Sequence, residues 1–309
     1  MISRVTNENL DCGLVTLFMH NYCNYSCSYC SPIHRDNTHR WPATIDAYVN
    51  FLNDVRGRNP YLYVEVMGGE PTLWPQFRKF IDAIADERTY IEFSTNASRT
   101  LRYWEEFSSG PMYVMMSWHH EQCDDDHFVK VAKIMQHKVS LGIALMVVPE
   151  NFERAQRLSQ RLEELDIEIL PRFVRQDIDS AVFLNYTTDQ RDWITNYRYL
   201  KMKPHAIDWN LPVNLHLDGK KMRFPDILNN GLHNFKGMQC SAGIKRFYVN
   251  YDGNIYRCSR RVGPSLGNIF EQYQLPADGI ICDQDLCPCK WDALVEKSSS
   301  SELGNAIVV

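Results

Sequence analysis

The sequence predicts an α/β fold, an incomplete barrel made of six strand–helix units. Short runs of β-branched and aromatic residues alternate with helical stretches from Leu14 to about Val174. In the helical stretches, apolar residues recur three or four positions apart, as on the buried face of an amphipathic helix. The runs between them are continuously apolar, which is typical of parallel strands that helices cover on both faces.

The units follow one another in a regular order. The predicted strands span residues 13–20, 61–67, 90–95, 112–118, 139–148 and 167–174. The predicted helices span residues 44–55, 74–87, 124–137, 151–165 and 187–200. Thr44 and Asn151 are candidate N-caps, and Pro75 suits a first helical turn. This order predicts a partial (β/α)6 barrel of the TIM type, whose reactive groups sit at the C-terminal ends of the strands.

Beyond the barrel, the sequence predicts a small C-terminal domain that contains a β-hairpin. Residues 244–259 hold two β-type runs around Asp252-Gly253, a pair that favours a type I′ hairpin turn. The polar C-terminal tail is expected to be disordered. The expected division is a barrel at 1–202, a junction at 203–237, the small domain at 238–292 and the tail at 293–309.

Composition and charge limit the classes of partner. The chain has 309 residues, 44% of them hydrophobic and 23% charged, which suffices to bury a full core. A net charge of −5 argues against a nucleic acid substrate, because phosphates are normally met by clustered Lys and Arg. No apolar run approaches the roughly 20 residues that span a bilayer, and the N-terminal residues lack the apolar core of a signal peptide. We therefore expect a cytoplasmic protein that binds neither membrane nor nucleic acid.

The ten cysteines fall mainly into two groups. Cytoplasmic thiols stay reduced, so clustered cysteines are more often metal ligands than disulfide partners. The sequence therefore predicts two metal sites, with Cys12 and Cys123 outside both. The first group is Cys23, Cys27 and Cys30, and the second is Cys240, Cys258, Cys282, Cys287 and Cys289.

The first group lies in the loop that leaves the first predicted strand. Its spacing is C-x3-C-x2-C, and the aromatic Tyr29 precedes the last cysteine. Three thiolates bind an iron–sulfur cluster but leave one iron without a protein ligand, which is what a catalytic site needs. A structural zinc site, with His20 or His34 as the fourth ligand, is the alternative.

This spacing resembles the signature of the radical SAM superfamily. The resemblance implies a [4Fe-4S] cluster on Cys23, Cys27 and Cys30 whose open iron chelates S-adenosylmethionine, with Tyr29 among the cofactor-binding residues. It also implies that reduction, by an electron donor such as flavodoxin or ferredoxin, cleaves the sulfonium. The resulting 5′-deoxyadenosyl radical abstracts hydrogen from the substrate.

Segments at the ends of the following strands also resemble those that bind S-adenosylmethionine in this superfamily. Gly68-Gly69-Glu70-Pro71 follows the second strand and matches the family's GGEP segment, whose backbone meets the amino end of the cofactor. Glycines permit that close approach. The resemblance extends to Ser94, Thr95, Asn96, Ser117, Val147 and Val148 at the ends of the third to fifth strands. The alternative interpretation of each of these residues is structural: a turn, a helix cap, a strand end or a position in the core.

The second group resembles a SPASM or twitch domain, a C-terminal extension of radical SAM enzymes that carries auxiliary iron–sulfur ligands. Cys240 is followed by seventeen residues and then Cys258, and Gly253 gives the segment G-x4-C. The last three cysteines follow in the run CDQDLCPC. Five cysteines suit the shorter twitch type, with one auxiliary cluster of four ligands and one spare cysteine. A structural zinc ribbon is the alternative.

The loop after the fourth strand, SWHHEQCDDDH, carries groups that would decide the fate of a substrate radical. His119, His120 and Glu121 are candidate bases for an oxidation, and Cys123 is a candidate hydrogen donor for an epimerisation. Cys123 alternatively is a small buried residue. The three aspartates that follow are expected to begin a helix and to complement its dipole.

Three functional hypotheses follow from these motifs. The first is an enzyme that oxidises or epimerises a small molecule, such as a sugar, a cyclitol or a nucleotide-like metabolite, because no peptide-recognition domain is evident. The second is a maturase that crosslinks or epimerises a ribosomally made peptide, since many relatives with auxiliary clusters have that role. The third is a non-enzymatic, zinc-held binding module.

Overall fold

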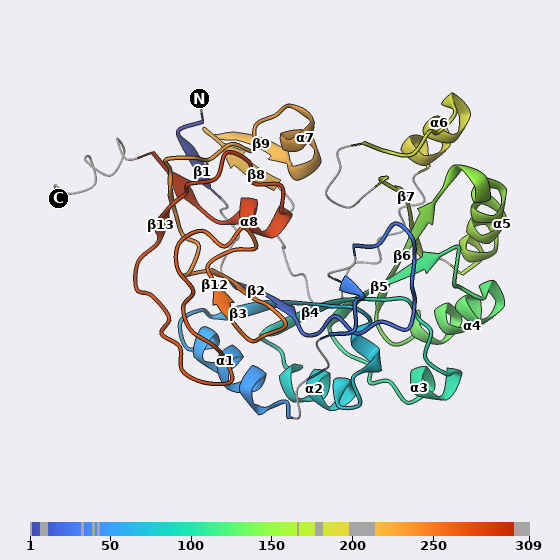
Figure 1. The fold of residues 1–309 in the computed structure, drawn as a ribbon, viewed down its shortest axis with the longest axis horizontal. Helices are drawn as coiled ribbons and strands as arrows, with labels where there is room; N and C mark the ends of the chain where they lie inside the picture. Colours follow the sequence, from blue (N-terminus) through green and yellow to red (C-terminus); the bar gives the residue numbers. More distant parts are fainter. Residues whose placement is uncertain are drawn as a thin grey trace. The chain divides into compact units, whose positions relative to one another are not determined.

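The computed structural model describes residues 2–6, 12–31, 34–38, 41, 44–165, 167–176, 182–197 and 214–299. Contacts between Cα atoms divide the chain into two compact units (Figure 1). The first unit contains the described residues within 1–17, 46–65 and 209–309, and the second contains those within 18–45 and 66–208. In the part of the chain that the structure describes, every helix is too short or too polar to span a bilayer.

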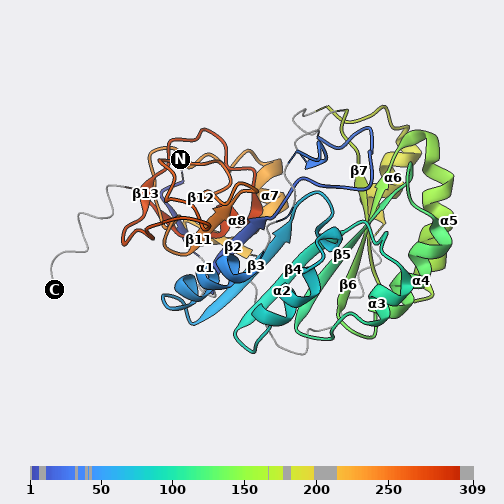
Figure 2. The same ribbon diagram turned by 60° about the horizontal axis from the view of Figure 1, so that its bottom comes forward.

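The second unit is built on parallel strands. These are β4 (Thr89–Thr95), β5 (Met112–His119), β6 (Ser140–Val147) and β7 (Glu168–Phe173), side by side in chain order. Its helices are α2 (Phe77–Ile84), α3 (Leu101–Glu105), α4 (Asp125–Met135), α5 (Phe152–Glu163) and α6 (Thr188–Asn196). Figure 2 shows α3, α4 and α5 along one side of these strands. Because the four strands are parallel, their C-terminal ends meet at one edge, where the predicted site residues lie.

α4 shows why these residues fold as they do. The Asp124 side chain accepts a hydrogen bond from the His127 N–H at 2.8 Å, so that it caps the helix, as the sequence predicted for this acidic run. Phe128, Val131 and Met135 recur three or four positions apart and are fully buried. The period of the apolar residues thus determines which face of α4 packs against the strands.

The first unit contains most of β2 (Cys12–Phe18) and β3 (Tyr61–Met67), which α1 (Asp46–Arg56) connects. β11 (Arg246–Val249) pairs in parallel with β2, and in antiparallel with β12 (Ile255–Tyr256). Every residue of β2 is buried, as expected for a strand that reads as one apolar run.

A second sheet in the first unit joins distant segments of the chain. Its strands, in spatial order, are β13 (Ile280–Ile281), β10 (Gln239–Cys240), β14 (Lys297–Ser298), β1 (Arg4–Thr6), β8 (Asn214–Leu217) and β9 (Lys220–Arg223). α7 (Phe224–Asn229) follows β9, and α8 (Lys290–Leu294) precedes β14. β10, which contains Cys240, therefore pairs with β13, directly before Cys282, and with β14, which follows the last cysteine of the group.

Six strand–helix units follow one another along the chain, from β2 and α1 to β7 and α6. The predicted α/β fold with a parallel sheet is therefore confirmed, and it is consistent with a partial barrel. α1 and α2 begin at Asp46 and Phe77, two or three residues later than expected. α3 was not predicted, because its five residues are too few to show a helical period.

The hairpin turn between β11 and β12 differs from the prediction. Val249 pairs with Ile255, so five residues, 250–254, form the turn in place of a two-residue type I′ turn. The Asn250 side chain accepts hydrogen bonds from the N–H groups of Asp252 and Asn254, at 3.1 and 2.9 Å. An asparagine side chain that satisfies the turn backbone explains the longer loop.

The predicted junction and tail also contain regular structure. β8, β9 and α7 fall within residues 203–237, and the end of α8 and β14 fall within residues 293–309. In place of the expected disorder, β14 is held between β1 and β10. Residues 203–213 and 300–309 lie outside the described residues, and the predicted domain boundaries stay a prediction.

Candidate active site and auxiliary cysteine site

The cysteine loop, residues 19–31, follows β2 without helix or strand. The Met19 N–H donates to the Met67 carbonyl at 3.0 Å, and the Cys23 N–H donates to the Asn37 Oδ1 at 2.9 Å. The Cys30 N–H donates to the Cys27 carbonyl at 3.1 Å. Main-chain hydrogen bonds therefore fix the course of the loop that carries the first cysteine group.

The three thiols of this loop are protonated at neutral pH in the absence of a metal. Burial raises the pKa of Cys23 to about 11 and that of Cys27 to about 12, and it also raises the pKa of Cys30. Binding of a cluster would therefore release protons. Three thiols in one loop are the donor set of an iron–sulfur cluster with one open iron, so these residues fit such a group.

The two histidines considered as fourth zinc ligands pack against aromatic rings. The His20 ring lies 5.8 Å from that of Trp41, and the His34 ring lies 5.1 Å from that of Phe18. Among the described residues, no three His, Cys, Asp or Glu side chains surround a position for a single metal ion.

The GGEP segment lies directly against the cysteine loop. The Gly69 N–H donates to the His20 carbonyl at 2.7 Å, and the Glu70 N–H donates to the Tyr22 carbonyl at 2.8 Å. A Cβ on Gly68 would lie 2.6 Å from the His20 oxygen, and a Cβ on Gly69 would lie 2.2 Å from the Tyr22 oxygen. Both glycines are therefore required for this close approach of two backbones.

Glu70 joins the GGEP segment to the end of β4. Its side chain is 1% exposed and accepts hydrogen bonds from the N–H and hydroxyl of Thr72, the Thr95 hydroxyl and the Asn96 N–H. Burial raises the pKa of Glu70, although these donors act in the opposite direction. Its carboxyl group thus has four donors within the protein, and the cofactor contact predicted for Glu70 stays a prediction. Pro71 begins the short 3-10 helix η2 (Pro71–Leu73).

Asn96 places an amide group beside the first cysteine of the motif. Its Nδ2 donates to the Asn24 Oδ1 at 3.0 Å and contacts the Cys23 sulfur at 3.9 Å. The Asn24 Nδ2 in turn donates to the Ser98 hydroxyl at 3.0 Å. The structure thus brings Asn96 to the cysteine loop, and sequence reasoning missed its partners Asn24 and Ser98.

Tyr29 stacks on both histidines at the end of β5. Its ring lies 6.0 Å from that of His119 and 5.9 Å from that of His120. The Tyr29 hydroxyl lies 3.0 Å from the His119 Nδ1. Burial lowers the pKa of His119 to about 4, so its imidazole is neutral at physiological pH. A neutral ring nitrogen is available as a base.

Glu121 ties the loop after β5 to the cysteine loop. It accepts hydrogen bonds from the Ser28 N–H, at 2.8 Å, and from the Ser28 hydroxyl. Burial opposes ionisation, but the hydrogen bonds from Ser28 outweigh it and lower the pKa of Glu121. The carboxylate is therefore ionised and engaged near neutral pH.

Cys123 is 7% exposed and lies close to the cysteine loop. The Tyr25 hydroxyl is near enough to affect the pKa of its thiol, although burial is the larger influence and raises that pKa to about 12. The Cys123 Sγ also contacts the Asp124 carbonyl at 3.6 Å. Cys123 therefore keeps its S–H at physiological pH.

Arg154 anchors the loop that carries these groups. It donates to both Asp125 carboxylate oxygens, at 2.9 Å, and to the carbonyls of His120 and Cys123, at 2.8 Å. The Trp118 Nε1 also donates to Asp125 at 2.8 Å. Sequence reasoning missed Arg154, because nothing in the spacing of α5 connects it with a loop thirty residues earlier.

Three predicted cofactor residues lie at the expected strand ends. Ser94 is exposed near the end of β4, and Ser117 is half-buried near the end of β5. Val147 is fully buried, and its carbonyl accepts a hydrogen bond from the Tyr186 hydroxyl at 2.7 Å. Their roles toward S-adenosylmethionine stay predictions.

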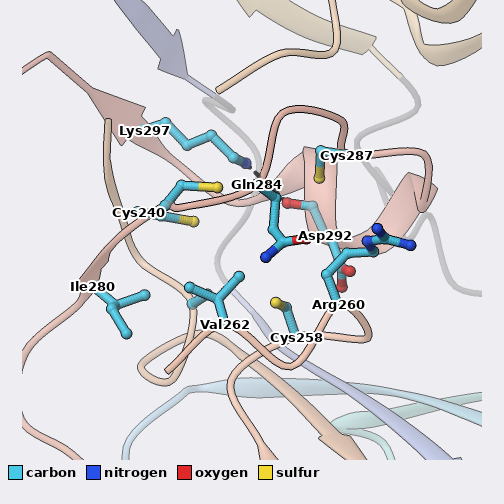
Figure 3. A pocket seen from close by; sticks show the side chains of 11 residues that line it. Cys240, Cys258, Arg260, Val262, Ile280, Gln284, Cys287, Asp292 and Lys297 are labelled. Atoms are coloured by element: carbon cyan, nitrogen blue, oxygen red, sulfur yellow. Dashed lines mark hydrogen bonds between the residues drawn. The ribbon is translucent and has the colours of Figure 1, made fainter. Parts of the chain in front are cut away.

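In the first unit, four of the five C-terminal cysteines line one cavity (Figure 3). All four are buried, and Cys289 is not among the residues that line the cavity. Cys289 is the N-cap residue of α8, and its carbonyl accepts the Ala293 N–H at 3.0 Å. The lining cysteines are Cys240, Cys258, Cys282 and Cys287.

Main-chain contacts bring these four cysteines together from separate segments. The Cys282 N–H donates to the Met238 carbonyl at 2.9 Å, and the Cys287 N–H donates to the His233 carbonyl at 2.8 Å. A Cβ on Gly279 would lie 2.2 Å from the Cys240 oxygen, so β13 approaches β10 closely only because this residue is glycine. Four thiols around one cavity are the usual donor set of an iron–sulfur cluster.

Charged side chains are buried beside these cysteines. The Arg246 Nε donates to the Asp292 carboxylate at 2.8 Å, and these two residues are 1% and 3% exposed. Asp292 also accepts hydrogen bonds from the N–H and hydroxyl of Ser259. Lys297, 3% exposed, donates to three main-chain carbonyls. Sequence reasoning did not single out Arg246, Asp292 or Lys297.

Comparison with known proteins covers fold and family. The structure is similar to that of SuiB from Streptococcus suis bound to precursor peptide SuiA, with a TM-score of 0.55, 14% identity, and coverage of 85% of this chain and 64% of that one. For SuiB bound to S-adenosylmethionine, the TM-score is 0.54 and the identity is 15%, and the match covers 84% of this chain and 64% of that one. For anSMEcpe with bound AdoMet and the Kp18Cys peptide, the TM-score is 0.47 and the identity is 18%, and the match covers 84% of this chain and 78% of that one. The chain thus spans slightly less than two thirds of SuiB.

The sequence comparisons identify a family resemblance over part of the chain. No curated protein matches the chain. The model of the Radical SAM superfamily matches residues 17–160, which include the three-cysteine loop, the GGEP segment and the strand ends described above. Residues 17–160, slightly less than half of the chain, are therefore similar to the radical SAM domain.

Proposed function

We propose that the protein is an enzyme in which Cys23, Cys27 and Cys30 hold a [4Fe-4S] cluster. When bound, this cluster would cleave S-adenosylmethionine reductively and supply a 5′-deoxyadenosyl radical for hydrogen abstraction. The observation that carries the proposal is the backbone contact between the cysteine loop and the GGEP segment, at 2.7 and 2.8 Å. The three-thiol loop and the GGEP segment are thereby held against each other, because the two glycines permit a close approach of the backbones.

The residues after β5 would decide the outcome for the substrate. Cys123 keeps its S–H near neutral pH, and Arg154 holds its carbonyl at 2.8 Å, so a hydrogen atom is available from a fixed position. His119 is neutral and is the better candidate base. Glu121 is engaged by Ser28, and we assign it to positioning the loop. Cys123 supports epimerisation, and His119 supports oxidation.

The auxiliary site would add a second cluster on Cys240, Cys258, Cys282 and Cys287, with Cys289 as the spare cysteine. The donor set supports this assignment, because these four thiols line one cavity and Cys289 does not. A cluster there would exchange electrons with the protein's redox partners. An electron donor of the flavodoxin or ferredoxin kind is the partner that this chemistry needs.

We propose a small-molecule substrate of the sugar, cyclitol or nucleotide-like class. A ribosomally made peptide is the second candidate, and one observation favours it: the fold is similar to that of SuiB, whose structure was determined with precursor peptide SuiA, at a TM-score of 0.55. The zinc-held binding module is the non-enzymatic alternative to both.

Anaerobic reconstitution tests the proposal. The protein is incubated with S-adenosylmethionine, dithionite and candidate substrates, and 5′-deoxyadenosine and the substrate mass are measured. Loss of two hydrogens supports oxidation, and unchanged composition with deuterium uptake from solvent supports epimerisation. Cys123→Ala should abolish deuterium uptake and preserve 5′-deoxyadenosine formation. Zinc in place of iron and sulfide, or iron without formation of 5′-deoxyadenosine, contradicts the proposed function.

A further inference from the structure

Lys297 is a buried ammonium group in the wall of the auxiliary cavity. Its side chain is 3% exposed and points into the space bordered by the cysteines (Figure 3). The Nζ donates to the carbonyls of Asp292, Ala293 and Val295, at 2.8, 3.1 and 2.8 Å. Three acceptors use the full donor capacity of a protonated lysine, so the geometry is that of a cation.

These hydrogen bonds satisfy the donors of Lys297 without neutralising its charge. None of the three acceptors carries a formal charge, and the nearby Asp292 carboxylate is engaged by Arg246 and Ser259. The Lys297 amine also lies 4.7 Å from the centre of the Phe235 ring, an additional contact for a cation. The three carbonyls lie at the C-terminal end of α8, where a lysine side chain caps the helix, and the same side chain lines the cavity, so that its charge can act on a negative group there.

Lys297 lines the same cavity as the four cysteines that would hold the auxiliary cluster. An iron–sulfur cluster with four thiolate ligands carries net negative charge, and reduction by one electron adds another. A neighbouring cation stabilises the reduced form more than the oxidised form, so it raises the reduction potential.

We propose that Lys297 is the buried counter-charge of the auxiliary cluster and sets its potential above the value that the four thiolates alone would give. This inference rests on the proposed function, in which Cys240, Cys258, Cys282 and Cys287 hold that cluster. Lys297 acts through charge and does not ligate iron. Its proposed effect is on the reduction potential of the cluster.

The test uses the full chain with Cys23→Ala, Cys27→Ala and Cys30→Ala, so that only the second cysteine group holds a cluster. After anaerobic reconstitution with iron and sulfide, the midpoint potential is measured by titration with dithionite followed by electron paramagnetic resonance. Lys297→Gln removes the charge but keeps two donors for the carbonyls, and Lys297→Arg keeps the charge. Lys221→Met removes an exposed charge from the same unit, where solvent screens it.

The expected result is a midpoint shifted to more negative potential in Lys297→Gln, with Lys297→Arg and Lys221→Met close to the parent. Loss of the cluster in Lys297→Gln alone also supports the charge role. An unchanged midpoint in Lys297→Gln, or equal loss of cluster or fold in Lys297→Gln and Lys297→Arg, overturns it. A parent that binds zinc, or no iron and sulfide, instead refutes the auxiliary cluster and removes the inference with it.

Discussion

The two cysteine groups gather their thiols by different routes. Cys23, Cys27 and Cys30 lie within one loop of the second unit. The four cysteines of the cavity come from β10, from the segment after β12, from the segment after β13 and from the approach to α8 in the first unit. Local spacing therefore specifies the first site, whereas strand pairing and loop contacts assemble the second.

The surroundings of the two groups also differ in burial. The first group has charged neighbours, Glu121 and Arg35, in the same loop region, and two of its thiols are half-buried. The four cysteines of the cavity are all buried, near the buried charged side chains of Arg246, Asp292 and Lys297. We infer that the first site is accessible to a cofactor and a substrate, whereas the second is shielded from solvent. Variants that remove one site at a time test this difference.

The largest effect is expected from removing one ligand of each site. Cys27→Ala should cost about four iron atoms per chain and abolish formation of 5′-deoxyadenosine, because the cluster that binds the cofactor is lost. Cys258→Ala should cost a similar amount of iron but leave cleavage of S-adenosylmethionine detectable. Iron and sulfide analysis, together with 5′-deoxyadenosine assays, distinguishes the two.

Cys289→Ala is the matched control for the second site, because Cys289 does not line the cavity. It should retain the iron content of the parent protein. A loss of about four iron atoms in this variant would show that Cys289 is a ligand and that the set of four assigned here is wrong.

An intermediate effect is expected at the buried ion pair. Arg246→Met leaves Asp292 as a buried charge and should lower the free energy of unfolding by about 3–5 kcal/mol, as measured in urea on the metal-free protein. The double variant Arg246→Met and Asp292→Leu should be less destabilised than the sum of the two single variants. Additive losses would mean that the two side chains, 2.8 Å apart, stabilise the fold independently.

A smaller effect is expected from His119 as pH falls. Its pKa is about 4 in the folded protein and 6.5 in the unfolded chain, so the unfolded state binds more protons between these values. Stability should therefore decrease by about 2–4 kcal/mol from pH 7 to pH 4 through this group. His119→Gln should flatten that part of the pH profile in urea unfolding. An unchanged profile would indicate that His119 is accessible to protons in the folded state.

Much of the fold and of the first site could be predicted because the signals are local. Continuous apolar runs mark β2 to β6, the cysteine spacing marks the loop, and Asp124 caps α4 as expected for an acidic run. The glycines of GGEP indicated a close backbone approach, and the structure shows which backbone they approach, that of His20 and Tyr22.

The remaining features depend on contacts that no periodicity or motif encodes. The motif indicates a cofactor contact through the backbone of the GGEP segment, but it does not reveal that the Glu70 carboxyl group accepts hydrogen bonds from Thr72, Thr95 and Asn96. Lys297 lies in a segment that reads as a polar tail, and only the pairing of β14 with β10 brings it to the cysteines. For the same reason, the spare cysteine could be chosen only after the cavity was known.

The four hydrogen bonds of Arg154 have a consequence for specificity. With the carbonyls of His120 and Cys123 both held at 2.8 Å, the main chain at the thiol cannot swing toward a misplaced molecule. If Cys123 is the hydrogen donor, as proposed, selection would depend on how the substrate is positioned, because a stationary thiol can transfer hydrogen only to a carbon radical within its short reach.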